Sequence, residues 1–523
     1  MGALLDRLRD AIIGPRRSSA LKLHLRGAVR NVTGSCYVVE TPSGLLMVDC
    51  GLYQGARRLE ELNWRPFAFS PADIRWLVLT HAHIDHSGLT PRFVAEGYER
   101  DIIAHPATCD LADIMLRDSA HIQEEDAAWA EKKWRRGGRK TARPPGPLYT
   151  LEDAEAAVAR LRPLPYDQVV DLAPDVRLRL IDAGHILGSA TVEVSVRDGD
   201  RTLRLTFSGD IGAGESPIIR DPQPPPTTDF LVMESTYGDR LHDRTQARNE
   251  RFRAILTETL GRKGCVVIPA FSVGRTQELL YALNELEQAH ALPPFTAFVD
   301  SPLAIGATRV FRKHPECFSR VILDDIASGD DPFDFPGLRM TQTVEESKQI
   351  NHAPPPYIVL SAAGMCNAGR IRHHLINHLE NPNDLILFVG YQGENTLGRL
   401  IRDGRSPVRI LGRQVSVRAK VRAIDGFSAH ADRDGLLRWF AAIPQPPALT
   451  LVTHGEPRAS FAFRDALQEQ FGARALVPEL GGALDLSPDN RDLQQQVAEQ
   501  ENRADRAQWV PVTDAGGAEL EEA

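Results

Sequence analysis

The chain has 523 residues, of which 42% are hydrophobic and 25% are charged, and its net charge at pH 7 is −9. This composition is typical of a globular protein, and the length exceeds one hydrophobic core, so we expect about two or three domains. The acidic balance lacks the basic surplus that often marks a nucleic-acid-binding protein, so any such binding would need a local basic surface.

The cysteines and the N-terminus indicate the compartment. The six cysteines form no Cys-x-x-Cys pair, which argues against a thiolate zinc site and a redox dithiol. Residues 1–20 mix acidic and basic side chains into a short apolar run, which predicts a helix and linker, not a signal peptide. No apolar run approaches the ~20 residues that span a bilayer. We therefore expect a cytoplasmic protein with reduced cysteines and no membrane partner.

The first part of the chain is rich in strand-like runs separated by glycines, as in sheets joined by tight turns. Together with two helical stretches, these runs predict a first domain over residues 21–214. The strands are expected at 21–29, 35–41, 44–51, 76–80, 176–182, 190–196 and 202–209, and the helices at 91–97 and 106–135.

After a proline-rich stretch at 222–226, short buried strands alternate with helices, which predicts parallel βαβ units and a second domain over 215–412. Residues 413–485 resemble the first domain again, so the second domain is expected to be an insertion. A polar tail, partly disordered, is expected over 486–523. The strands of these parts are expected at 230–235, 264–270, 296–301, 357–362, 384–391, 421–430 and 448–456, and the helices at 275–290, 369–379 and 432–442.

The stretch from Thr80 to Gly88 (THAHIDHSG) carries three histidines and an aspartate, directly after an apolar run. A strand that ends there would place His81 and His83 on one face, because side chains two apart share a face. Asp85 and His86 would lie on the following turn. Imidazoles suit zinc, and a neighbouring carboxylate suits a second ion of the same kind.

Further metal-type residues follow apolar runs, where neighbouring strands would bring them together. Two clusters result, with a carboxylate that can bridge them, and two metals about 3.5–4 Å apart suit in-line attack on phosphorus. Asp49 is expected to hold the bridging water and to orient histidine ligands. One ion would be bound by His81, His83 and His185, the other by Asp85, His86 and His454, and Asp210 would bridge them.

A basic segment with interleaved tryptophans stands out between Lys132 and Arg143. Seven lysines and arginines lie in it, and Trp129 and Trp134 are close by. The segment is either the solvated end of a helix or a nucleic-acid contact, and both interpretations stay open.

These motifs resemble the metallo-β-lactamase fold, and the strings GHILGSA and FSGDIG resemble the forms found in its nucleases. The inserted segment resembles the β-CASP domain. ESTYG, which contains Glu234, is similar to its acidic motif A, FSAH with His430 to motif B, and THGE with His454 to motif C. The resemblance extends over residues 21–480, and PAFSVGRTQE, SAAGMCNAGR and VGYQGENTLGR also carry it.

The resemblance implies an α/β protein, a metallo-β-lactamase αββα sandwich with an inserted β-CASP parallel-sheet domain. The most similar type is the bacterial and archaeal ribonuclease related to the nuclease subunit of the cleavage and polyadenylation specificity factor. It implies that His430, held by Glu234, protonates the leaving 3′ oxygen. It also implies that Arg275, Ser361 and Gly364 contact RNA phosphates, although SAAGM replaces a more usual SSSGM-like loop.

We therefore expect a ribonuclease that uses two Zn²⁺ ions, with Mn²⁺ as an alternative, and cuts single-stranded RNA to 5′-phosphate and 3′-hydroxyl ends. The metal and proton-transfer steps are assigned to Asp49, Asp210, Glu234 and His430. A histidine in motif C favours RNA, because the DNA-directed branch typically has valine there. A DNA nuclease or repair factor, a lactamase- or thioesterase-type hydrolase and a scaffold subunit are the alternatives. Three questions stay open: whether cleavage is endonucleolytic or 5′-to-3′ exonucleolytic, whether the protein also binds DNA, and whether it forms a homodimer.

Overall fold

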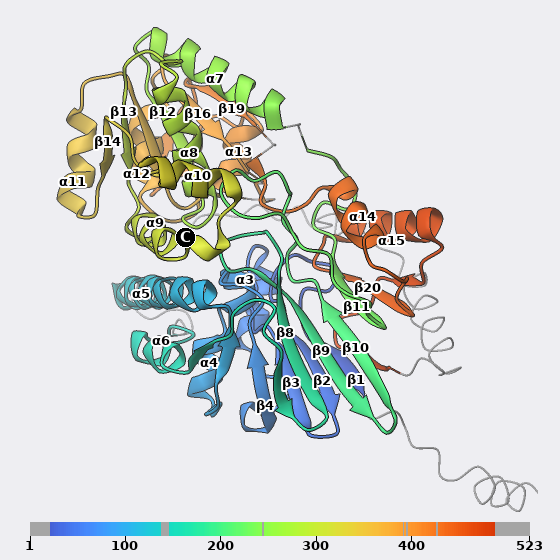
Figure 1. The fold of residues 1–523 in the computed structure, drawn as a ribbon. Helices are drawn as coiled ribbons and strands as arrows, with labels where there is room; N and C mark the ends of the chain where they lie inside the picture. Colours follow the sequence, from blue (N-terminus) through green and yellow to red (C-terminus); the bar gives the residue numbers. More distant parts are fainter. Residues whose placement is uncertain are drawn as a thin grey trace, which may run out of the picture.

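The computed structural model describes residues 21–136, 146–242, 245–390, 392–393, 396–424 and 427–486. They form two seven-stranded sheets, one six-stranded sheet and a two-stranded ribbon (Figure 1). The expected N-terminal helix, and the expected tail beyond Leu486, lie outside the described residues. No helix in the described part is both long enough and apolar enough to cross a membrane.

The first sheet joins both ends of the described chain, because its edge strand β22 pairs with β1. Helices α4 (Thr90–Ala95), α5 (Pro106–Arg136) and α6 (Leu151–Val158) lie on its outer side, where apolar side chains of α4 and α6 pack against it. Its strand order is β22 (Ala483–Asp485), β1 (Lys22–Leu25), β2 (Tyr37–Thr41), β3 (Gly44–Val48), β4 (Ile74–Val78), β5 (Ile102–Ala104) and β6 (Leu161–Pro163).

The second sheet packs face to face on the first, because one buried cluster contains Leu23 and Val39 of the first sheet with Leu178 and Leu205 of the second. Helices α14 (Arg433–Ala441) and α15 (Pro457–Phe471) cover its outer side. Its strand order is β21 (Ala475–Leu476), β20 (Leu449–Thr453), β11 (Phe230–Glu234), β10 (Arg201–Phe207), β9 (Ala190–Asp198), β8 (Val176–Asp182) and β7 (Val170–Ala173). The layers are those of the expected αββα sandwich.

The third sheet is entirely parallel and lies above the sandwich in Figure 1. Its four inner strands are short and almost entirely buried, as expected where helices cover both faces. Its order is β14 (Leu338–Met340), β13 (Thr296–Val299), β15 (Tyr357–Ser361), β12 (Val266–Pro269), β16 (Leu385–Phe388) and β19 (Lys420–Ala423). Around it lie α7 (Thr245–Gly261), α8 (Arg275–Gln288), α9 (Pro302–Lys313), α10 (Arg320–Ser328), α11 (Val344–Gln349), α12 (Ile371–His378), α13 (Leu397–Arg402) and the ribbon β17 (Val408–Ile410) and β18 (Arg413–Val415).

Two strands fall on the other side of the expected domain boundaries. Strand β11, expected within the insertion, pairs with β10 and β20 of the sandwich. Strand β19, expected after the insertion, pairs with β16 of the parallel sheet. A short buried apolar run looks the same in either kind of sheet, so sequence periodicity could not assign these strands.

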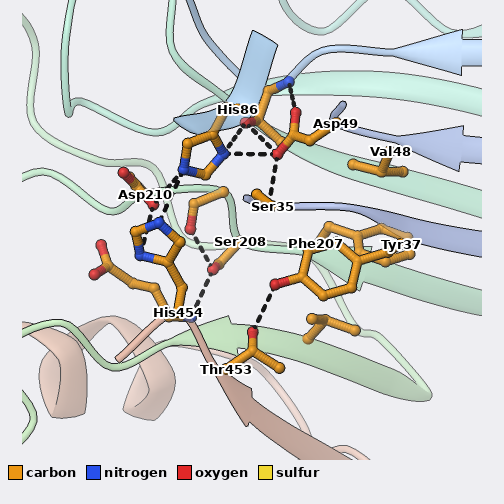
Figure 2. A pocket seen from close by; sticks show the side chains of 14 residues that line it. Ser35, Tyr37, Val48, Asp49, His86, Phe207, Ser208, Asp210, Thr453 and His454 are labelled. Carbon is orange, nitrogen blue, oxygen red and sulfur yellow. Dashed lines mark hydrogen bonds and ion pairs between the residues drawn. The ribbon is translucent and has the colours of Figure 1, made fainter. Parts of the chain in front are cut away.

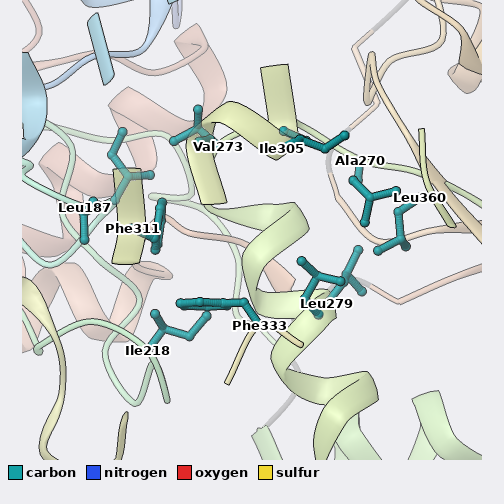
Figure 3. Packing of buried hydrophobic residues seen from close by; sticks show 14 of the residues in the cluster. Leu187, Ile218, Ala270, Val273, Leu279, Ile305, Phe311, Phe333 and Leu360 are labelled. Carbon is teal, nitrogen blue, oxygen red and sulfur yellow. The ribbon is translucent and has the colours of Figure 1, made fainter. Parts of the chain in front are cut away.

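The sandwich and the insertion share one apolar core, which fixes how they sit together. Leu187, in a sandwich loop, belongs to the same buried cluster as Ile305 and Phe311 of α9 in the insertion (Figure 3). At the edge of this core, Asp110 of α5 receives hydrogen bonds from Lys313 and His314, both 2.6 Å long. These contacts join the sandwich and the insertion at one interface.

Candidate metal centre

The histidine motif lies in a loop and one helical turn, not on the pleat of a strand. Strand β4 ends at Val78, so the expectation that His81 and His83 extend from the strand itself is wrong. His83 precedes the single turn α3 (Ile84–Ser87), which carries Asp85 and His86. The turn is fastened to the neighbouring loop by backbone hydrogen bonds from Cys50 to His86 and from Leu52 to Ile84. Backbone hydrogen bonds beyond the end of the strand therefore bring these side chains together.

Three histidine nitrogens form the first cluster. Nε2 of His81 lies 3.0 Å from Nδ1 of His83, which lies 3.3 Å from Nε2 of His185. Oδ2 of Asp210 lies 3.5 Å from the nitrogen of His81 and 3.6 Å from that of His185. Tetrahedral zinc with Zn–N bonds of about 2.0–2.1 Å keeps its nitrogens about 3.3 Å apart, so the spacing fits one ion.

The second cluster faces the other oxygen of Asp210. Nε2 of His86 lies 3.0 Å from Nε2 of His454, and Oδ2 of Asp85 lies 3.7 Å from the latter. Oδ1 of Asp210 lies 3.4 Å from Nε2 of His86, is buried and receives no hydrogen bond from the described residues. A buried carboxylate oxygen without a donor is costly unless a cation approaches it. This donor set therefore fits a second ion.

The charges of Asp210 and of the three histidines in the first cluster suit metal binding. Burial lowers the pKa values of His81 and His185 and lowers that of His83 to about 4, so these rings are neutral at pH 7. Burial alone would raise the pKa of Asp210, but the neighbouring histidines His454 and His86 outweigh it and keep this carboxylate ionised. Neutral imidazoles and an ionised carboxylate are the forms that bind divalent metals.

Asp49 lies behind His86 and orients it (Figure 2). Its Oδ2 lies 2.7 Å from Nδ1 of His86, which leaves Nε2 of that ring directed at the second cluster. Thr80 and Ser35 donate further hydrogen bonds to the same carboxylate. Asp49 thus has the position of a carboxylate that fixes a ligand's tautomer and angle. Its expected contact with a bridging water stays a prediction.

Glu234 and His430 meet at the edge of the centre. Glu234 ends β11, and its Oε2 lies 3.2 Å from Nδ1 of His430. Burial alone would lower the pKa of His430, but Glu234 and Asp210 outweigh it and raise this pKa to about 9. The imidazole is therefore protonated at neutral pH. Its ring packs 4.4 Å, centroid to centroid, from that of His185, so a protonated ring lies beside the first cluster.

Two residues of the centre have left-handed backbone conformations that are rare outside glycine. Asp49 has a φ of 62° and His454 a φ of 46°. Such conformations cost free energy and persist where the surroundings enforce them, commonly at functional sites. For His454, the backbone N–H donates to the carbonyl of Ala28 at 2.7 Å, which holds the loop after β20 in place.

The three expected RNA contacts lie at or just after the ends of strands β12 and β15, at the carboxyl edge of the parallel sheet. Arg275 begins α8 after β12, is largely buried and donates to Glu278 at 2.6 Å. Ser361 ends β15 and donates its hydroxyl to the carbonyl of Asp300. Gly364 follows, and a Cβ there would approach the ring of Phe271 to 2.9 Å. Their phosphate contacts stay predictions, and the hydroxyl of Ser361 is already engaged within the protein.

The basic segment is described only as far as Arg136, and residues 137–143 lie outside the described part. Lys132, Lys133, Arg135 and Arg136 end the helix α5. Nε of Arg135 pairs with Glu131 at 2.8 Å, and Nζ of Lys133 lies 5.4 Å from the ring centre of Trp129. Both earlier interpretations of the segment remain.

Sequence reasoning missed several residues that hold the side chains or backbone of the centre in place. Thr80 bonds Asp49, and the Oγ1 of Thr236 lies 3.2 Å from Nδ1 of His454. Nε2 of His242 lies 3.1 Å from the carbonyl oxygen of His430. Thr80 and Thr236 stand inside the motifs already singled out, and His242 follows Glu234 closely, so proximity to the motifs was the available signal.

Sequence models of three families match the chain in order. The metallo-β-lactamase superfamily matches residues 29–256, the Beta-Casp domain 276–401, and the Zn-dependent metallo-hydrolase RNA specificity domain 414–478. Ribonuclease TTHA0252 of Thermus thermophilus is 37% identical over 430 residues, which cover 82% of this chain and 92% of the relative.

The chain belongs to the β-CASP family of metallo-β-lactamase-fold proteins. Transcription termination factor FttA of Methanocaldococcus jannaschii is 28% identical, with 90% of this chain and 72% of that relative covered. FttA of Methanococcus maripaludis is 30% identical, with 84% and 68% covered. Membership of the β-CASP family confirms two predictions, the fold and the class of metal-dependent nucleases. The Zn-dependent class agrees with the histidine and aspartate clusters.

Proposed function

We propose that this β-CASP protein is a ribonuclease that hydrolyses phosphodiesters at a two-metal centre. The observation that carries the proposal is the position of Asp210, whose two oxygens face two separate clusters of histidine nitrogens. Two Zn²⁺ ions bound there, or Mn²⁺ in their place, would activate a water and neutralise charge on the phosphate. The ions would be held by His81, His83 and His185 on one side and by Asp85, His86 and His454 on the other, with Asp210 between.

The proton donor would be His430. Its Nδ1 is held by Glu234, so Nε2 is the nitrogen free to protonate the leaving 3′ oxygen. The pKa of about 9 keeps the ring charged at neutral pH. Hydrolysis with the proton delivered to that oxygen leaves a 3′-hydroxyl on one product and a 5′-phosphate on the other.

RNA is the proposed substrate class. The RNA specificity domain match and the relative named a ribonuclease both support it. Single-stranded RNA would reach the centre along the interface between the sandwich and the insertion, where the loops with Arg275 and Ser361 lie. The cytoplasmic location expected from the sequence also belongs to this proposal.

Cleavage of end-labelled single-stranded RNA tests the proposal. His83→Ala should abolish cleavage in a zinc-replete assay, whereas His352→Ala, at an exposed histidine outside the centre, should cleave like the wild type. Unchanged cleavage by His83→Ala would refute the metal mechanism. Labels at each end separate internal cuts from stepwise 5′-to-3′ removal, because only the latter releases mononucleotides from the 5′ end first.

A DNA nuclease of the same family is the second candidate, because the metal centre itself does not read the sugar. Competition between equal concentrations of single-stranded RNA and DNA of one sequence decides between them. We expect RNA to be cut first. Preferential cleavage of DNA would replace the RNA proposal while leaving the metal centre intact.

A further inference from the structure

His242 lies beside the proposed proton donor and is held on three sides. Its ring nitrogen Nε2 is 3.1 Å from the carbonyl oxygen of His430. Its backbone N–H donates to Oδ2 of Asp432 at 3.0 Å, and its ring packs edge-on against Tyr237 with centroids 4.7 Å apart. The side chain is half-buried. None of these three partners belongs to the two metal clusters.

The backbone around His430 shows why this contact matters. Residues 212 and 430 form an antiparallel bridge, with hydrogen bonds from Ala431 to Ile211 at 2.8 Å and from Ala213 to Ala429 at 2.9 Å. In such a bridge the flanking residues make the bonds, so the N–H and C=O of the central residue point away from the partner. Within the described part of the chain, the donor that reaches the carbonyl of His430 is His242.

The other restraint on the donor acts at its ring. Glu234 contacts Nδ1 of His430 and also accepts the backbone N–H of Ile211, so this carboxylate is tied to the bridge itself. His430 is thus held at its ring by Glu234 and at its carbonyl by His242. Loss of the second bond would leave a backbone acceptor without its protein donor and free the peptide to tilt.

The protonation of His242 agrees with a donor at Nε2. Burial is the main cause that lowers the pKa of His242, so the ring is neutral at pH 7 and has one N–H. A carbonyl oxygen only accepts, so that hydrogen lies on Nε2.

We propose that His242 is a positioning residue that holds the imidazole of His430 at the leaving 3′ oxygen, through the hydrogen bond from its Nε2–H to the carbonyl of His430. This role rests on the proposed function, because it requires His430 to protonate the leaving group. It predicts that His242 affects the departure of the 3′ oxygen and not the binding of RNA or metal.

The test compares two substrates that differ in one atom. One is an ordinary RNA with a single cleavable linkage, and the other carries sulfur in place of the bridging 3′ oxygen. A thiol has a pKa of about 8.5, so the thiolate is a good leaving group and sulfur departs without protonation. His242→Phe keeps a ring but removes the donor, and His242→Gln keeps an N–H donor. His430→Ala marks complete loss of the proton donor, and His352→Ala is the control for a histidine outside the site.

We expect His242→Phe to lower kcat on ordinary RNA about 10- to 100-fold, part of the ~10²–10⁴-fold that a general acid supplies, with KM and bound zinc unchanged. On the sulfur substrate its kcat should lie within about twofold of the wild type. His242→Gln should recover most of the activity on ordinary RNA, and His430→Ala should show the same substrate dependence more strongly.

Three results would overturn the inference. Wild-type kcat for His242→Phe on ordinary RNA would show that the hydrogen bond does not matter. Equal losses on both substrates would show that His242 only stabilises the fold. If His430→Ala is not restored by sulfur, His430 is not the acid, so the proposed proton transfer and the inference both fail while metal-dependent cleavage stands.

Discussion

Glu234 should control the pH at which activity disappears. The pKa of His430 is raised from 6.5 to about 9 against the effect of its burial, with Glu234 the largest raising cause. A general acid works while protonated, so kcat should be sustained below this pKa and fall tenfold per pH unit above it. Glu234→Gln removes the charge with little change of shape and should move this alkaline limb to lower pH.

The size of the shift follows from the geometry. The carboxylate and the imidazole are 3.2 Å apart and the carboxylate is fully buried, with a side-chain exposure of 0%. An opposite charge this close shifts a pKa by about 1–3 units. Asp210 still raises the pKa of His430 in the variant, so we expect a fall in the lower part of this range, about 1–2 units. A fall from about 9 to about 8 or 7 leaves about 9% or 1% of the acid protonated at pH 9, against about half in the wild type. The loss of kcat should therefore be about 5- to 50-fold at pH 9 and slight at pH 6.

The assay is the pH profile of kcat on one single-stranded RNA, measured for the wild type, Glu234→Gln and the control Glu345→Gln. Glu345 is exposed on α11, so its variant should follow the wild type. Ratios between variants at each pH cancel effects on the metal-activated water. A loss of equal size at every pH would refute the reasoning, because Glu234 would then act only through its bond to Ile211.

Three further outcomes are expected. Asp210→Asn should lose bound zinc and cleavage together, since the amide has no charge and presents an NH2 group in place of an oxygen to one of the two clusters; full zinc content by mass spectrometry would contradict this. Asp49→Asn should weaken zinc affinity about 10- to 100-fold, as measured by chelator competition, because His86 loses its orienting partner. If the end of α5 binds RNA, the double change Arg135→Gln and Arg136→Gln should reduce the salt slope of binding by about one unit per lost phosphate contact. An unchanged slope would indicate a solvated helix end.

Short motifs allowed much of the centre to be predicted because ligand chemistry is local. His81, His83, Asp85 and His86 lie within six positions, so any compact conformation brings them near one another. The prediction that the pleat of a strand places His81 and His83 on one face is nevertheless wrong. Strand β4 ends at Val78, and hydrogen bonds from the neighbouring loop hold the turn. Residue type and spacing predict which side chains gather more reliably than they predict the backbone that carries them.

The sequence alone determined the ligand types, the alternation of strands and helices and the family resemblance, because these depend on neighbouring residues. The tertiary structure decided what depends on distant ones. Strand β11 joined the sandwich because β10 and β20 flank it. Asp210 came to face both clusters because the loops after β4, β8 and β20 meet the loop that carries it. His242 became visible only beside the carbonyl of His430, 188 positions away. Hydrogen bonds across such separations leave no periodic pattern, so only the folded chain reveals them.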